Sequence, residues 1–569
     1  MEQLDMLTIT RVYVALMRYI APGMTLILLL RCGLPLLTFP REPEIWAWLV
    51  RADGIRLPIT HWENLIGRGK HCDVVIPEPE ISRNHAVLTR YDDGSWTVSD
   101  ADSQNGITVN EASVDAQALN EGDQIGFGTQ VLTFLPATRQ QEQTMAALRT
   151  RASGVWGSFF NLVWLTLLQG LICLGFLLKK PEAAMDAAMG FGGIAVLQWL
   201  LLIFNYSIGR PAYEVETLAF LLCTMGMAVI CAVTPGETLK QLLAIILGLI
   251  LFLLLGWSLR DLQRAKRIRY VAAVLGMGLL VVTLLFGEVY YGAKNWVQIG
   301  GISLQPSELT KLCFVFVGAS TMDRLLQKRN ILLFILYTVA LCGFLALMND
   351  FGTALVFFTA FLIIAYLRSG SFGTILLAFT ALGFAGIIGL KIAPHALRRI
   401  TAWRHIWEAP LGVGYQQTQA LMATASGGLF GLGIGQGMMR NLFAADSDMV
   451  FATVSEEWGL ILMVLMILSV CAIALFVLRC ARVSRSSFYT IGSCTAAAIL
   501  LVQVVLNVLG TVDVLPLTGV TFPFLSNGGS SMLCAWGLLA FVKAADTRRS
   551  GSFAVRLHRK GNVHESNRG

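Results

Sequence analysis

Charged residues are scarce in this chain. Asp, Glu, Lys and Arg make up 14% of the 569 residues, whereas hydrophobic residues make up 55%. So few charges exclude an ordinary soluble chain of this length, and repeated apolar runs of about 20 residues are typical of membrane-spanning helices. The composition therefore predicts a polytopic α-helical membrane protein.

The 11 cysteines lack any CxxC spacing, and most lie within apolar runs, as Cys173 and Cys313 do. This pattern argues against a disulfide framework and a cysteine metal site, and it is typical of small buried apolar residues. The first 40 residues also lack a small-x-small cleavage site after a clean apolar core, which argues against a cleaved signal peptide.

The net charge of +7 does not require a nucleic acid partner. Basic clusters such as 260–269 and 548–560 lie between or after apolar runs. The positive-inside rule predicts that such loops stay in the cytoplasm, and contact with anionic lipid is a secondary interpretation.

Composition divides the chain into five regions. The N-terminal segment 1–49 is membrane-associated, with an apolar stretch at 12–38 that forms either a membrane helix or an interfacial one. Residues 50–136 alternate short apolar segments with turn residues, which predicts a small all-β sandwich. The remaining regions are a polar linker (137–154), a transmembrane domain (155–545) and a basic tail (546–569).

The whole chain is predicted to contain about 12–13 transmembrane helices. The runs after the linker lie at 155–178, 187–208, 214–233, 239–258, 270–291, 307–323, 331–348, 351–368, 372–392, 449–479, 487–510 and 529–545. Basic loops place the β sandwich and the C-terminal tail in the cytoplasm. The segments left outside the membrane are 292–306, 393–448 and 511–528.

The sandwich region contains, in order, IGRGKHCDVVIPEPEISRNHAVL, DSQNGITVN and LNEGDQIGFG. The order GR, SxxH and NG resembles the forkhead-associated (FHA) domain. Phosphate binding needs a guanidinium and neutral donors on rigid loops, which this region supplies. The resemblance implies phosphothreonine peptide binding by Arg68, Ser82, Arg83 and Asn105, with His85 and Gly67 structural. The alternative is a sandwich in which the Arg and Ser are ordinary surface residues.

Two outer stretches carry charge at the membrane edge. In AKNWVQIGGISLQPSELTKL, Glu308 and Lys311 are three residues apart and therefore share one helical face. In NDFGTALVFF, an unpaired Asp350 would cost several kcal/mol. We therefore expect a Lys311–Asp350 ion pair, which is either a structural clamp or part of the chemistry.

The outer segment 393–448 is basic. Arg398, Arg399, Arg404 and His405 bring positive charge outside the membrane, which predicts an anionic partner such as phosphate or pyrophosphate. Gln416 and Ser426 are further polar candidates for the same ligand. The glycines between 427 and 437 lack the Lys and Ser/Thr of a nucleotide P-loop, so they are expected to allow tight turns or close backbone approach.

The stretch AADSDMVFATVSEEWG (444–459) places four carboxylates around one membrane edge. Taken alone, Asp448 is best explained as a helix N-terminal residue favoured by the macrodipole. Glu456 and Glu457 lie about two helical turns deeper, where hydrogen-bonding or structural roles are favoured.

Together with the stretches at 293–312, 349–358, 393–448 and 517–531, this stretch resembles the SEDS family (shape, elongation, division and sporulation) over about 215–545. Members polymerise lipid II into peptidoglycan strands, usually with a class B penicillin-binding protein. The resemblance assigns the essential aspartate to Asp448. Asp446 stands where the family has histidine, and Met449 where it has phenylalanine. The chain also has about two more spans than the usual ten.

The implied chemistry inverts the anomeric centre of a lipid-linked sugar. Such a reaction needs a base for the acceptor hydroxyl and a group that stabilises the departing pyrophosphate. Asp448, with an ordinary pKa of about 4, would be ionised and is the candidate base. Arg399 and Arg404 are candidates for the pyrophosphate, with or without a divalent cation (Mg²⁺ or Mn²⁺); no metal ligands are assigned.

Three functions remain open at this point. The leading one is a bacterial cell-membrane glycosyltransferase with Asp448 on the outer face, localised or regulated by a phosphothreonine protein, itself the substrate of a Ser/Thr kinase. The second is a flippase for the lipid-linked precursor, although its charges should lie nearer the bilayer midplane. The third is a non-catalytic scaffold that recruits phosphoproteins.

Overall fold

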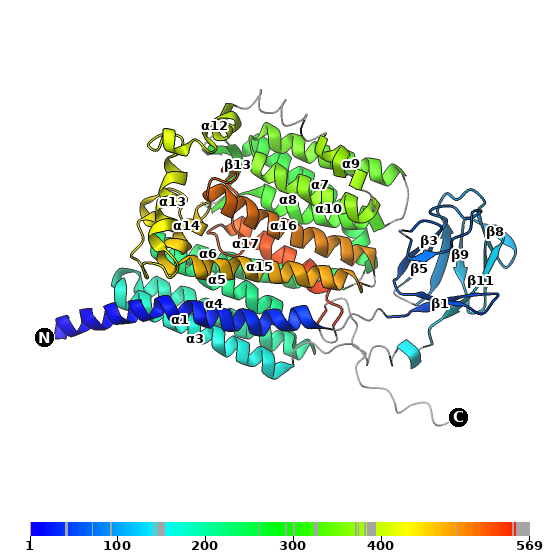
Figure 1. The fold of residues 1–569 in the computed structure, drawn as a ribbon, viewed down its shortest axis with the longest axis horizontal. Coiled ribbons are helices and arrows are strands. Elements are labelled where there is room, and N and C mark those ends of the chain that lie inside the picture. Colours follow the sequence, from blue (N-terminus) through cyan, green and yellow to red (C-terminus); the bar gives the residue numbers. More distant parts are fainter. Residues whose placement is uncertain are drawn as a thin grey trace.

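The structure is a computed structural model that describes residues 2–552, except 40–43, 71, 92–93, 139, 143, 145–153, 261, 291–292, 300–301, 324–327, 370–371, 374, 381–382, 384–393, 485 and 549–550. It contains a large helical bundle and a separate β domain (Figure 1). This architecture confirms the predicted fold class. Much of the predicted linker, of the span at 372–392 and of the basic tail lies outside the described residues.

The β domain is a sandwich of two sheets, ordered β2-β1-β11-β10-β7-β8 and β4-β3-β5-β6-β9. It begins at Ala47 rather than at residue 50, because Ala47 pairs with both Ile59 and Pro136. Alternating side chains such as Leu88 and Phe134 fill the space between the sheets. The strands are β1 Ala47–Arg51, β2 Arg56–Ile59, β3 Glu63–Gly67, β4 Val74–Val75, β5 Ala86–Arg90, β6 Trp96–Asp100, β7 Ile107–Val109, β8 Ala112–Val114, β9 Ala116–Leu119, β10 Gln124–Phe127 and β11 Gln130–Pro136.

Among the described residues, eight helices are long and apolar enough to cross a membrane, and three shorter apolar helices accompany them. The main helices are α1 Glu2–Thr38, α3 Val155–Lys179, α4 Ala184–Ser207, α5 Glu214–Val233, α6 Thr238–Leu259, α7 Leu262–Phe286, α8 Pro306–Asp323, α9 Lys328–Leu347, α10 Phe351–Ser369, α15 Leu460–Ala481, α16 Ser487–Thr511 and α17 Gly529–Ala544. Shorter helices are α12 Pro394–Ala402, α13 Tyr415–Gly427 and α14 Val450–Trp458. A small sheet of β12 Glu288–Tyr290, β13 Ala293–Ile299 and β14 Ile302–Leu304 precedes α8.

The predicted continuous span at 449–479 is wrong, because the helix is interrupted at Gly459, which separates α14 from α15. Gly459 has φ +90°, and a Cβ there would collide with the backbone of Leu429 and Gly431. The predicted span ran across this point, although Glu456, Glu457 and Gly459 interrupt the apolar residues on either side. Both the positive φ and the close approach of the segment around Leu429 require a glycine at this position.

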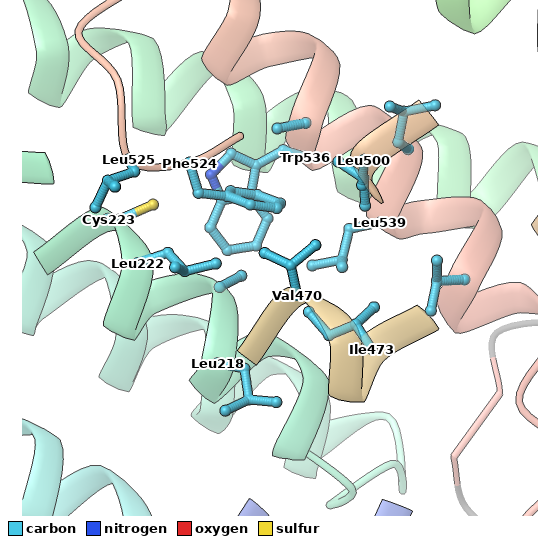
Figure 2. Close-up of a cluster of buried hydrophobic side chains, with 14 of the residues drawn as sticks. Leu218, Leu222, Cys223, Val470, Ile473, Leu500, Phe524, Leu525, Trp536 and Leu539 are labelled. Carbon is cyan, nitrogen blue, oxygen red and sulfur yellow. The ribbon is translucent and has the colours of Figure 1, made fainter. Parts of the chain in front are cut away.

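The bundle core draws on nearly all the long helices, and one part of it lies where α5, α6, α15, α16 and α17 meet. Leu218 and Leu222 of α5 face Val470 and Ile473 of α15 there, around the buried Trp536 ring (Figure 2). Phe220, Phe252 and Phe524 have ring centroids 5.0–5.8 Å from that of Trp536. Aromatic pairs at these distances contribute beyond simple area burial, so this ring cluster helps to hold α17 against α6 and connects it to α5.

The two ends of the bundle differ (Figure 1). The β domain lies beside one end, and α12, α13 and α14 lie at the other, which we call the site end. Opposite the site end, Lys543 of α17 pairs with Glu216 at 2.9 Å. Arg548 pairs there with Asp546 at 2.9 Å and with Glu214 at 3.3 Å.

The N-terminal helices belong to the same bundle. α1 packs against α3, α5 and α15. The Arg31 Nε donates to Asn161 Oδ1 at 2.7 Å, and the Tyr19 ring lies 4.8 Å from that of Phe430. These contacts favour the membrane-helix alternative for residues 12–38, and α1 is one of the eight long apolar helices.

Candidate functional site

Three separate segments bring Asp448 and Arg399 together at the site end. Asp448 lies two residues before α14, and Arg399 lies on α12. A Cβ on Gly519 would lie 3.3 Å from Asp448 Oδ2 and 3.9 Å from Arg399 Nη1, and Gly519 has φ +71°. Arg399 Nη1 donates to the Leu517 carbonyl at 3.3 Å. A glycine is therefore needed where the 517–520 loop passes both charged groups.

The pKa of Asp448 differs from the ordinary value of about 4 that the sequence led us to expect. Burial is the largest cause that raises the pKa of Asp448 to about 6; Arg399 opposes this rise, and the nearby charges of Asp446 and Asp350 add to it. The residue lies outside the spanning helices. A carboxylate with this pKa is largely ionised at neutral pH and is a stronger base than an exposed aspartate.

Asp446 holds two loops together. Its Oδ2 accepts from Thr234 Oγ1 and from Asn527 Nδ2, each at 2.8 Å. Its backbone carbonyl also accepts from the Asn527 amide at 2.8 Å. Asp446 therefore ties the end of α5 to the loop before α17.

The expected Lys311–Asp350 ion pair is not the one that forms. Lys311 Nζ lies 2.6 Å from Glu308 Oε1, one turn earlier on α8, and both side chains are buried. Asp350 instead accepts from the Thr353 amide at 3.0 Å and from two side-chain amides, Asn295 Nδ2 at 3.3 Å and Gln305 Nε2 at 3.4 Å. The i, i+3 partner is available to Lys311 without any contact between helices, so it is preferred.

Arg404 lies on the same exposed segment as Arg399. Its backbone amide donates to Asp513 Oδ2 at 3.1 Å, and its guanidinium carbon lies 5.2 Å from the centroid of the Trp403 ring. The half-buried Gln416 is on α13, and the buried Gln417 beside it donates to the Gly510 carbonyl at 2.9 Å. Gln417 and Asp513 were not predicted from the sequence. Gln417 fixes α13 to the end of α16, and Asp513, just after that helix, holds the backbone of Arg404.

Ser426 is far from Asp448. Its hydroxyl donates to Ala423 within α13 at 2.8 Å, and the adjacent Gly427 lies against the Ser455 carbonyl. Ser455 is toward the far end of α14 from Asp448, about 10 Å away along the helix. The sequence proposed Ser426 as a ligand for the pyrophosphate. The structure does not place it beside Asp448 and Arg399.

The two deeper glutamates organise the glycine-rich loop. Glu456 accepts from the Met438 and Met439 amides, both at 2.9 Å. A Cβ on Gly437 would collide with the carboxylate of Glu456, and one on Gly431 would collide with the Glu457 backbone. These glycines allow the loop to pack closely against α14. From the sequence, the same glycines could have served either tight turns or the close approach of a ligand.

The candidate phosphopeptide residues lie on adjoining loops of the β domain. The Arg68 amide donates to the Ser82 carbonyl at 3.0 Å, and the Ser82 hydroxyl accepts from the Gln104 amide at 3.0 Å. Asn105 Nδ2 donates to the Glu80 carbonyl at 2.8 Å. Arg68, Arg83 and Asn105 are exposed, so their side chains are accessible to a ligand.

Two residues have structural roles beneath these loops. His85 is fully buried, and its ring nitrogens contact the Ser82 amide at 3.1 Å and the Gly106 carbonyl at 3.0 Å. A Cβ on Gly67 would meet the Ser82 carbonyl at 3.0 Å, so the two loops approach too closely for a side chain.

No metal centre is apparent in the part of the chain that the structure describes. Its His, Cys, Asp and Glu side chains do not gather in groups of three or more that could hold an ion. No chemical step is therefore assigned to a divalent cation.

Comparison with known proteins matches the two parts of the chain separately. A family model described as "Cell cycle protein", for FtsW, RodA and SpoVE, matches residues 217–551. A model of the FHA domain matches residues 64–128. The first match begins inside α5, so the helices α1, α3 and α4 precede it.

The chain is 29% identical over 322 residues to the peptidoglycan glycosyltransferase RodA of Mycobacterium tuberculosis, covering 53% of this chain and 69% of that protein. It is 33% identical over 282 residues to the stage V sporulation protein E of Bacillus subtilis, covering 46% and 75%. The crystal structure of the rod shape determining protein RodA of Thermus thermophilus is 24% identical with a TM-score of 0.43, covering 58% of this chain and 94% of that one.

Proposed function

Because the chain belongs to the FtsW, RodA and SpoVE family of cell cycle proteins, the SEDS family, and carries an FHA domain, we propose that it polymerises lipid II into peptidoglycan glycan strands. Relatives named peptidoglycan glycosyltransferase support this activity. The chain is a multi-pass bacterial membrane protein, and the proposed orientation puts Asp448 outside the cell and the FHA domain in the cytoplasm.

In this reaction the acceptor hydroxyl attacks the anomeric carbon of the lipid-linked donor. The new glycosidic bond forms as the bond to the pyrophosphate breaks, with inversion at that carbon. Asp448 takes the hydroxyl proton, for which its pKa of about 6 is well matched at neutral pH. The exposed Arg399 beside it receives the negative charge of the departing lipid pyrophosphate.

The proximity of Asp448 and Arg399 across the Gly519 loop is the observation that carries this proposal. A base and a cation this close can act on the two sides of one reacting carbon. Arg404, on the same exposed segment, is a second contact for the pyrophosphate, and Gln416 on α13 is a neutral one.

The test is polymerisation of purified lipid II by the full chain, alone and with its cognate class B penicillin-binding protein. We expect glycan polymer from the wild type and a loss of at least about 10²-fold in Asp448→Asn, which keeps the shape of the side chain but removes the base. Polymerisation by this variant at the wild-type rate would refute the assignment. Lipid II crossing a vesicle bilayer without polymer would instead favour the flippase.

The FHA domain is proposed to localise or regulate the enzyme by binding a phosphothreonine protein, itself the substrate of a Ser/Thr kinase. The exposed Arg68 and Arg83 flank the Ser82 loop and offer charge to the phosphate. In Arg68→Ala we expect affinity for phosphothreonine peptides to fall at least about tenfold. Arg56→Ala, an exposed arginine on β2, is the matched control and should bind normally. Equal affinity of the two variants would contradict the assignment.

A further inference from the structure

One buried amide on α16 reaches the backbone of the candidate base. Asn507 is 2% exposed, and its Nδ2 donates to the Asp448 carbonyl at 3.0 Å and to the Val520 carbonyl at 2.9 Å. One side chain thus holds the backbone of Asp448, two residues before α14, and that of Val520, the residue after Gly519. The sequence offered one signal of it, a polar residue within an apolar run.

We propose that Asn507 is a positioning residue that fixes Asp448 against the Arg399 and Gly519 side of the site; this rests on the function proposed above. Asp448 lies in an irregular segment, and the two bonds from Asn507 connect it to a long buried helix. Asn507 Oδ1 is also buried, with no partner among the described residues. The side chain of Asn507 therefore stabilises the fold only through the two hydrogen bonds that its Nδ2 donates, because its buried oxygen makes none.

The test compares Asn507→Leu with Gln503→Leu in polymerisation of lipid II. Gln503 is also 2% exposed and lies one turn earlier on α16, so both variants replace a buried amide with a similar apolar side chain. For Asn507→Leu we expect kcat to fall roughly 10- to 100-fold with little change in KM, because a small misplacement of a base has this cost. Gln503→Leu should stay within about threefold of the wild type.

The pH profile of activity distinguishes a positioning role of Asn507 from a role in stability alone. When Asp448 is released from Asn507, its carboxylate gains water, so the acidic midpoint of activity should move from about 6 toward the ordinary value of about 4. If Asn507→Leu does not fold, Asn507→Asp keeps the volume and removes the donors, with the same expected loss in kcat. Activity equal to that of Gln503→Leu, or an unmoved midpoint, would overturn the proposal. A wild type without polymerase activity would instead refute the proposed function.

The other end of α16 carries an independent observation, a direct contact with the FHA domain. Ser486 Oγ donates to Glu63 Oε1 at 3.1 Å, and the Ser487 amide donates to Glu63 Oε2 at 2.9 Å. His61 Nδ1 lies 2.5 Å from the Ser484 carbonyl. Glu63 is 5% exposed, and Trp62 packs against both the bundle core and the sandwich core.

This contact has the form of a helix cap supplied by another domain. The Ser486 hydroxyl already accepts from the Phe488 amide, and Glu63 adds an anion where the macrodipole of α16 is positive. Glu63 begins β3, and that strand leads directly to Arg68 in the phosphopeptide loops. From Ser487, α16 extends about 30 Å to Asn507.

We infer that the FHA domain is seated on the bundle through Glu63, and that this seating acts on Asp448 through α16. The test uses the full chain in lipid nanodiscs. In Glu63→Ala, hydrogen exchange of the amides at 486–490 should accelerate roughly fivefold or more, as expected for a lost cap. Polymerisation of lipid II should also fall by roughly threefold or more.

Glu121→Ala removes an exposed acid from another loop of the same domain and is the matched control, with exchange and polymerisation expected at wild-type values. Unchanged exchange in Glu63→Ala would refute the seating. Faster exchange with an unchanged polymerisation rate would refute the coupling to Asp448. The exchange measurement does not depend on the enzyme's activity, so it tests the seating even if the proposed function fails.

Discussion

The two ends of the bundle use charge differently, although each contains a direct buried ion pair, which near the site end is Lys311 with Glu308 of the same helix. Opposite the site end, Lys543 and Arg548 are fully buried and paired directly with acids. At the site end, Asp350 and Asp446 accept hydrogen bonds from neutral amides and hydroxyls, and Arg399 is exposed. The pairs of Lys543 and Arg548 connect the C-terminal end of α17 and the segment after it to α5, whereas Asp350 and Asp446 have no cation as a direct partner among the described residues.

The largest expected effect is a loss of stability at the paired end. Lys543→Met leaves Glu216 buried without its cation, and we expect destabilisation of about 3–5 kcal/mol. Thermal unfolding in detergent, followed by size-exclusion chromatography, measures it. Arg399→Met is the counterpart at the site end and should change stability by less than about 0.5 kcal/mol, because this side chain is exposed. Equal losses would remove the distinction between the two ends.

The second effect is on activity at the site end. Arg399→Ala should lower the rate of lipid II polymerisation by roughly 10- to 100-fold, because the departing pyrophosphate loses a cation. Arg440→Ala is a suitable control, since this arginine is also exposed and follows the glycine-rich loop. A similar loss in both variants would mean that overall positive charge, rather than the position of Arg399, is what matters.

The third prediction concerns pH. Asp448 accepts a proton only when ionised, so activity should rise with pH through about 6 and level off above it. Below the midpoint the rate should fall by about tenfold per pH unit, as the ionised fraction does. Because Arg399 lowers the pKa of Asp448, the residual activity of Arg399→Ala should have a midpoint at higher pH. A midpoint that does not move would contradict the proximity of the two groups.

The smallest effect is expected at Asp446. Asp446→Asn keeps an oxygen that can accept from Thr234 or Asn527, so polymerisation should stay within about threefold of the wild type. Asp446→Leu removes the acceptor and should cost about 1–3 kcal/mol of stability. A loss in Asp446→Asn as large as that in Asp448→Asn would assign chemistry to both aspartates.

Much of the bundle could be predicted from hydropathy, because an apolar run long enough to span a membrane must form a helix to satisfy its own backbone. The run at 487–510 became α16, Ser487–Thr511, almost unchanged. The β domain followed from its alternating pattern and turn residues. The break at Gly459 could not be predicted, because it depends on a loop that approaches from a distant part of the chain.

The sequence proposed residues for the candidate site but indicated few of their contacts. The motifs singled out Asp448 and Arg399, but not that burial raises the pKa of Asp448 to about 6. They also paired Lys311 with the wrong acid, since periodicity shows which residues share a face and not which helices meet. Asn507 was missed because one amide in an apolar run does not indicate what it contacts.

The sequence by itself determined the membrane class, the two-part organisation and the identity of the charged residues, because these depend on composition and local spacing. Tertiary structure decided which of those residues meet, how far Asp448 is removed from water and where the FHA domain rests. Such properties arise from contacts between segments far apart in the chain, as when Asn507 reaches the Asp448 carbonyl and Glu63 caps the other end of the same helix.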